Sequence, residues 1–138
     1  MKTLTTLIDV HQHILDKHQA ALAKLQQEYN ILDESLVALQ AQYQQQCEVV
    51  SKEPGFSMTF GAYQAQVNEK KDYIALAKQQ LQERMNQTRA IITKEYTTIK
   101  KYEQLLEQKR QEEALEQSRK DTQAMDELAI QQFERNDT

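Results

Sequence analysis

The chain has 138 residues, of which 39% are hydrophobic and 28% charged, with no Trp and a formal net charge of -4. This composition is too polar for a thick globular core, and the slight negative charge excludes a general attraction to nucleic acid or anionic membranes. Cys47 is the only cysteine, which excludes an intramolecular disulfide. No apolar run is long enough for a signal peptide or a membrane span, so we expect a cytoplasmic chain with protein partners.

An unbroken heptad repeat fills the first third of the chain. Its a positions are Ile8, Leu15, Leu22, Tyr29, Leu36, Tyr43 and Val50, and its d positions are Leu4, His11, His18, Leu25, Leu32, Leu39 and Gln46. A sustained 3.5-residue period predicts a helix over about residues 2–52 that pairs with another helix. His11 and His18 lie one heptad apart, too far to share a metal ion, and we interpret both as polar seam residues that fix the register.

A single turn is predicted over residues 53–58, because the only Pro and both Gly residues lie between positions 54 and 61. Gly55 can adopt the left-handed conformation that ends a helix. A second helix is expected over about residues 59–134, with Phe60, Val67, Ile74 and Leu81 in one register and Met85, Ile92, Ile99 and Leu106 in the next. The four-residue step from Leu81 to Met85 is a stutter, which unwinds a supercoil locally without breaking the helix.

The short connection predicts an all-α fold for residues 1–138, a single antiparallel coiled-coil hairpin whose second helix projects beyond the first. Paired residue numbers should sum to roughly 112 to 116, which places basic residues of the second helix opposite acids of the first. We expect a monomer in the absence of partners. The residues expected in the seam are Ile8, Leu15, Leu22, Leu25, Leu32, Leu36, Met85, Ile92, Ile99 and Leu106.

The end of the chain returns to an apolar pattern after a polar stretch. Residues 111–138 hold three basic and eight acidic residues, and Met125, Leu128, Ala129 and Phe133 share one helix face. The first helix is too short to cover this face, so we interpret it as a binding surface for another protein. A polar helix of this length is marginal in water, and it should fray alone and become ordered when bound.

Catalysis is not expected, because the sequence shows no nucleophile with a base, no metal-ligand cluster and no phosphate-binding loop. No cofactor, metal or nucleic acid is predicted as a ligand. The basic stretch from Lys94 to Arg110 contains its own acids and is interpreted as a solvated face. Tyr73, Tyr96 and Tyr102 are poorly explained by one seam, so at least one of them is a candidate for partner contact.

The sequence Met125-Asp126-Glu127-Leu128-Ala129, followed by Phe133 and Arg135, resembles the C-terminal signature of the flagellar export protein family FliJ. That signature typically reads Met-Asp-Glu-Phe-Ala and then an aromatic and a basic residue, so Leu128 departs from it. The layout is also similar: an early heptad helix, a short turn, a Tyr63-Gln64 pair and a longer second helix. Lys70 is a second departure, because this position is usually apolar in the family.

The resemblance implies a non-enzymatic stalk of the flagellar type III export apparatus, cytoplasmic and peripherally associated with the inner membrane, that serves motility and chemotaxis. It implies binding to a hexameric FliI-like export ATPase, with promotion of its assembly and activity, through Met125, Asp126, Glu127, Leu128, Ala129, Phe133 and Arg135. It also implies contact with export chaperones, and with a FlhA-like export gate through Leu39, Tyr43, Gln46, Val67, Ile74 and Ala77. The alternatives are the equivalent stalk of a virulence secretion system and a generic coiled-coil scaffold or chaperone.

Overall fold

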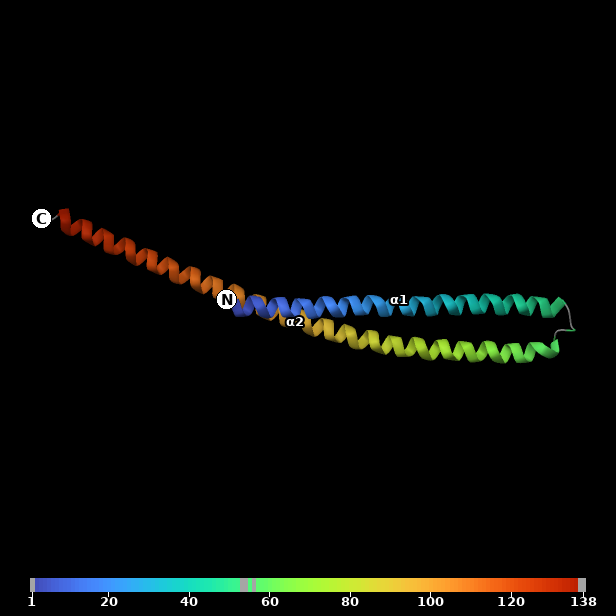
Figure 1. Cartoon of the computed structure of the whole chain (residues 1–138). Helices are drawn as coiled ribbons and strands as arrows, with labels where there is room; N and C mark the ends of the chain where they lie inside the picture. The colour runs from blue at the N-terminus through green and yellow to red at the C-terminus, as the bar shows by residue number, and fades with distance from the viewer. Residues whose placement is uncertain (1, 53–54, 56, 137–138) are drawn as a thin grey trace. The chain divides into compact units, whose positions relative to one another are not determined.

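The protein consists of two long helices, seen in a computed structural model that describes residues 2–52, 55 and 57–136 (Figure 1). Helix α1 spans Lys2–Lys52 and helix α2 spans Ser57–Asn136, and no described residue lies in a strand. The chain divides into two compact units. We call Met1–Ile14 with Glu95–Thr138 the terminal unit, and Leu15–Lys94 the hairpin unit.

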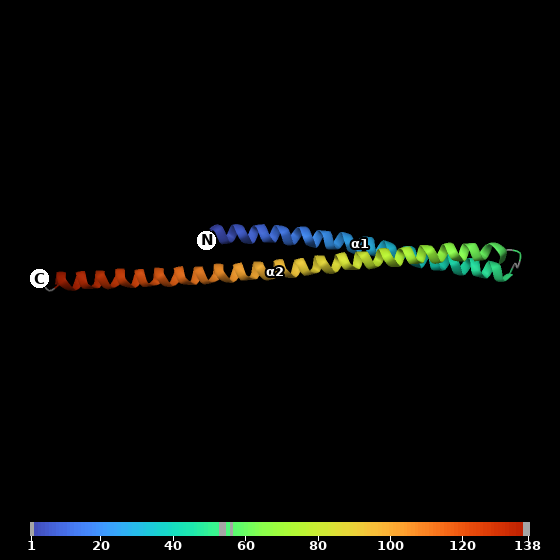
Figure 2. The ribbon, with the colours of Figure 1, turned by 90° about the horizontal axis from the view of Figure 1, so that it is seen from below.

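Within the hairpin unit the two helices pair antiparallel. Asp33 of α1 forms an ion pair with Lys78 of α2. Further along α1, the Tyr43 ring stacks on the rings of Phe60 and Tyr63, with centroids 5.9 and 6.4 Å apart. As the residue number rises along α1 it falls along α2, and both views show the two helices side by side in this unit (Figures 1 and 2). The predicted fold class, two long antiparallel helices with the second one longer, is confirmed.

The core is a single narrow stripe along each helix. Leu15, Val67, Leu81 and Met85 are buried in the hairpin unit, together with Ile74. The predicted seam residues all face inward, either buried or half-buried. Each helix of a two-helix pair can bury only the stripe that faces its partner, so most of the remaining side chains are exposed.

The inward face of α1 drifts near its C-terminal end. Gln46, the last d position of the predicted heptad, is exposed, whereas Cys47 is half-buried. An α-helix has 3.6 residues per turn and drifts by about 20° per heptad against a strict 3.5-residue repeat. At this d position the inward direction has therefore passed to the next residue, whereas Val50, the following a position, is still half-buried.

Helix α2 continues without a break through the stutter. Leu81 and Met85 are 9% and 1% exposed, so both ends of the four-residue step face α1. Since α2 is continuous from Ser57 to Asn136, the prediction that the register changes without ending the helix is confirmed. Lys70, the residue noted above at a position that is usually apolar, is exposed, whereas its neighbour Lys71 is half-buried.

The connection between the helices was only partly predicted. Helix α1 ends at Lys52 as expected, while α2 begins at Ser57 and ends at Asn136, two residues beyond the expected limit at each end. Residues 53, 54 and 56 of the predicted turn lie outside the described residues. Gly55 is described and its φ is not positive, so the predicted left-handed conformation is wrong.

A polar cluster joins the helices in the middle of the hairpin unit. The Lys78 Nζ atom pairs with Asp33 and lies over the Tyr29 ring, 5.1 Å from its centroid. The hydrogen bond to Asp33 raises the pKa of Lys78 above its ordinary value and so favours the ammonium form. The predicted register would place Asp33 opposite about residues 79–83, so the observed pairing lies just outside it.

The terminal unit contains a shorter paired stretch and a long unpaired one. Near the start of α1, the His11 Nδ1 atom lies 2.5 Å from the Glu95 Oε2 atom, and the His11 ring lies 5.6 Å from that of Tyr102. Ile99 is buried beside them at 5% exposure. Beyond Leu106, every residue of α2 from 107 to 136 is exposed, and none of the described residues of α1 lies beside this segment (Figure 2).

Truncation of the most deeply buried side chain should destabilise the helix pair. We expect Met85→Ala to lower the free energy of unfolding by about 2–4 kcal/mol, because it leaves a cavity in a stripe with few other buried groups. Urea denaturation followed by circular dichroism measures this change. The matched control is Val37→Ala, at a position 65% exposed, which should change stability by less than about 0.5 kcal/mol. Equal effects of the two substitutions would contradict the described core.

Candidate protein-binding sites

The C-terminal part of α2 presents an exposed apolar face in the terminal unit. Met125 and Phe133 are each 71% exposed and Leu128 is 58% exposed. Asp126, Glu127, Ala129 and Arg135, the other residues of the predicted ATPase-binding set, are exposed as well. No part of α1 covers these side chains within the described portion of this unit. The face is therefore open to another protein.

Ile130 widens this face and was not singled out in the sequence. It is 58% exposed and lies one turn before Phe133. Its position follows from helical geometry, because residues three apart are neighbours on the helix surface. The i, i+3 spacing from Phe133 could have identified it, but the face predicted from the sequence comprised only Met125, Leu128, Ala129 and Phe133.

Local polar contacts support the unpaired segment before this face. The Gln117 amide donates to the Asp121 carboxylate at 3.1 Å, and the Lys120 Nζ atom lies 3.9 Å from the Glu116 carboxylate. Pairs spaced four residues apart stabilise an isolated helix by only about 0.2–0.5 kcal/mol each. The segment is helical as far as Asn136, and its predicted fraying in the absence of a partner stays a prediction.

The residues proposed for export-gate contact lie together in the hairpin unit, but most of them also contribute to the seam. Val67 and Ile74 are 2% and 8% exposed. Leu39, Tyr43 and Ala77 are half-buried, and of the six residues only Gln46 is exposed. A partner at this surface would therefore contact Gln46 and the edges of the half-buried residues.

Tyr43 is the centre of an aromatic cluster that the heptad pattern did not predict. Its ring stacks with those of Phe60 and Tyr63, and the Lys71 Nζ atom lies 5.4 Å from its centroid. The interaction with the Cys47 side chain, followed by desolvation, raises the pKa of Tyr43 above its ordinary value. The cluster borders a cavity of about 380 Å³ lined partly by Gln46 and Tyr63.

The other polar residues considered in the sequence occupy varied positions. His11 and His18 both face inward, and His11 pairs with Glu95 as described above. Tyr102 faces inward beside His11, whereas Tyr73 and Tyr96 are 72% and 53% exposed. Within the described residues no group of three or more His, Cys, Asp or Glu side chains could hold a metal ion, and no helix is long and apolar enough to cross a membrane.

The Tyr43 environment predicts a pH-dependent effect. Because the pKa of Tyr43 is raised, the neutral phenol is favoured in the folded state, and the stability it contributes is lost as the pH rises through that higher pKa. Replacing the main cause, in Cys47→Ala, should move the pKa of Tyr43 down towards its ordinary value. Ultraviolet titration of tyrosinate measures the shift, with Tyr43→Phe identifying its signal. An unchanged titration curve in Cys47→Ala would show that Cys47 does not set this pKa.

The comparison with protein families gives one result that covers the chain. The family model described as Flagellar FliJ protein matches residues 1–138. No curated protein and no solved structure matches this sequence. The match agrees with the helical layout and with the Met125–Arg135 segment that carries the resemblance. The chain therefore belongs to the FliJ family, whose members are components of the flagellar export apparatus.

Proposed function

We propose that this protein is a non-catalytic stalk of the flagellar type III export apparatus that binds a hexameric export ATPase through the C-terminal face of α2. The observation that carries the proposal is the open apolar face formed by Met125, Leu128 and Phe133, which no element covers in the described part of its unit. An amphipathic helix whose apolar side lacks an internal partner suits insertion into a complementary site on another protein. Family membership supplies the apparatus in which that partner would be found.

The chemistry of the face supports a protein partner. Its apolar side chains are flanked by Asp126, Glu127 and Glu134, so a matching surface would combine an apolar pocket with basic groups. Binding would bury the two most exposed large apolar side chains of the segment, Met125 and Phe133. It would also stabilise the helical form of a segment that local pairs alone support weakly.

A second part of the proposal concerns the hairpin unit. We propose contact with a FlhA-like export gate around Leu39, Tyr43, Gln46 and Ala77, with Val67 and Ile74 supporting this surface from the seam. The exposed Gln46 amide and the edge of the Tyr43 ring are available to a partner, while the aromatic cluster holds the Tyr43 ring in place. Contact with export chaperones, a cytoplasmic location beside the inner membrane and a monomeric state without partners complete the proposal.

The flagellar role is preferred over the alternatives. The family match favours a flagellar stalk over the equivalent protein of a virulence secretion system. A generic coiled-coil chaperone would bind unfolded proteins broadly and would not depend on residues 125–135. The two classes therefore predict different effects of substitutions in the C-terminal face.

Substitutions in the C-terminal face should separate binding from folding. We expect the double variant Met125→Ala/Phe133→Ala to bind the cognate export ATPase at least about tenfold more weakly and to lose stimulation of its ATP hydrolysis, because two exposed anchors are removed. Thermal unfolding should be unchanged, since neither side chain is packed. Surface plasmon resonance and an ATPase assay provide the measurements.

The matched control is Leu115→Ala, an exposed leucine of the same helix that lies outside the signature. It should leave both ATPase binding and stimulation unchanged. If the double variant behaves as this control does, the C-terminal face is not the ATPase-binding site.

The proposed gate surface can be tested at its exposed position. We expect Gln46→Ala to weaken binding to the cytoplasmic domain of the export gate by about three- to tenfold, because it removes an exposed hydrogen-bonding group without disturbing the seam. Isothermal titration calorimetry measures the affinity, and the exposed neighbour Gln45→Ala is the control. Equal affinities of the two variants would place gate binding elsewhere.

A further inference from the structure

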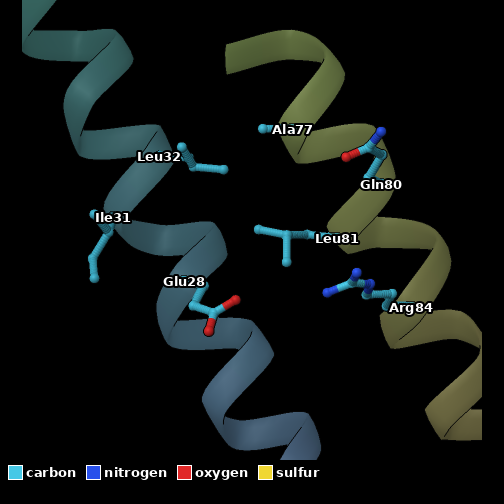
Figure 3. A pocket seen from close by; sticks show the side chains of 7 residues that line it. All are labelled: Glu28, Ile31, Leu32, Ala77, Gln80, Leu81 and Arg84. Atoms are coloured by element: carbon cyan, nitrogen blue, oxygen red, sulfur yellow. The ribbon is translucent and has the colours of Figure 1, made fainter. Parts of the chain in front are cut away.

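A groove between α1 and α2 in the hairpin unit forms an apolar surface that is separate from the C-terminal face. It has a volume of about 330 Å³, and its lining includes Leu32 of α1 and Ala77 and Leu81 of α2. Figure 3 shows these three side chains directed into the space between the helices. The groove shares only Ala77 with the proposed gate surface, so its other residues can be tested independently.

The groove exists because the packing layer around Leu81 is incompletely filled. Ala77 contributes only a methyl group at its seam position, and the register of α2 shifts between Leu81 and Met85. Leu32 is half-buried, as are most seam residues of α1, so part of its side chain remains open to the groove that it lines. A projecting apolar side chain from outside could fill this layer as a knob fills a hole.

One side chain that lines the groove is both apolar and largely exposed. It is Ile31 of α1, which is 60% exposed. Single exposed apolar residues are ordinary on protein surfaces. Here Ile31 lines an open apolar groove, so an occupant would remove it from water together with Leu32 and Leu81.

Opposite charges stand on the two sides of the groove. Glu28 of α1 and Arg84 of α2 both line it and point toward the space between the helices (Figure 3). Within the described part of the chain, neither side chain takes part in an ion pair. An occupant with charges of a single sign would be repelled on one side, whereas an occupant with one basic and one acidic flank would be attracted on both.

We propose that this groove is a docking site for one amphipathic helix of a partner protein. The helix presents apolar side chains at heptad spacing to Leu32, Ala77 and Leu81, with a basic flank toward Glu28 and an acidic flank toward Arg84. The complex is locally a three-helix bundle.

Binding of three synthetic helical peptides tests the proposal on the full chain. All three peptides carry Leu at the a and d positions and differ in their flanking positions. The mixed peptide has Lys on one flank and Glu on the other. The two single-sign peptides have Lys on both flanks or Glu on both flanks. Fluorescence anisotropy at low salt should show the mixed peptide binding at least about tenfold more tightly than either single-sign peptide. Glu28 is exposed, and the substitution Glu28→Arg makes both sides of the groove basic. The peptide with Glu on both flanks should then bind most tightly.

Two further variants locate the binding in the groove. Ile31→Lys should weaken the mixed peptide at least about tenfold, while Val37→Lys, at an exposed position of α1 outside the groove lining, should not. Equal affinities for the three peptides, no detectable binding, or equal effects of the two lysine variants would overturn the proposal. Light scattering that showed an Ile31-dependent dimer of the protein alone would also overturn it, in favour of a second copy as the occupant.

Discussion

The rest of the structure depends on one constraint, which is that two helices can bury only the narrow stripe along which they meet. In the hairpin unit that stripe reaches full burial only at residues such as Val67 and Met85. The remaining side chains stay in contact with water unless another protein binds them. Stability and function are therefore divided by position: inward residues hold the helices together, and outward residues are available for binding.

Polar and aromatic groups in the seam help to fix the register of the two helices, to which apolar contacts contribute little. Asp33 with Lys78, and His11 with Glu95, each join α1 to α2 within one unit. Such pairs contribute modestly to stability, but a slip of the helices would separate them and expose the Tyr43 cluster to a different set of partners. These contacts hold the register within each unit, and the Asp33–Lys78 pair lies just outside the number sum predicted from the turn.

The sequence predicted the features that depend on repeated spacing. The heptad from Leu4 to Tyr43 identified the inward face of α1, and the stutter at Leu81 identified a register change in a continuous helix. It did not predict the passage from Gln46 to Cys47, because a binary pattern does not record the gradual drift of a 3.6-residue helix. Nor did it reveal the groove, which depends on the volumes of Ala77 and Leu32 and on the register that brings them together.

The same division by position decides which substitutions can report on binding. Val67 and Ile74 are almost fully buried, so changing either one alters the helix pair before any partner is considered. Phe133 and Ile31 are largely exposed, and their replacement leaves the seam intact. Loss of function at such exposed apolar positions would therefore reflect a lost contact with another protein. In a fold with so little interior, the exposed apolar residues are the more informative guide to what the protein does.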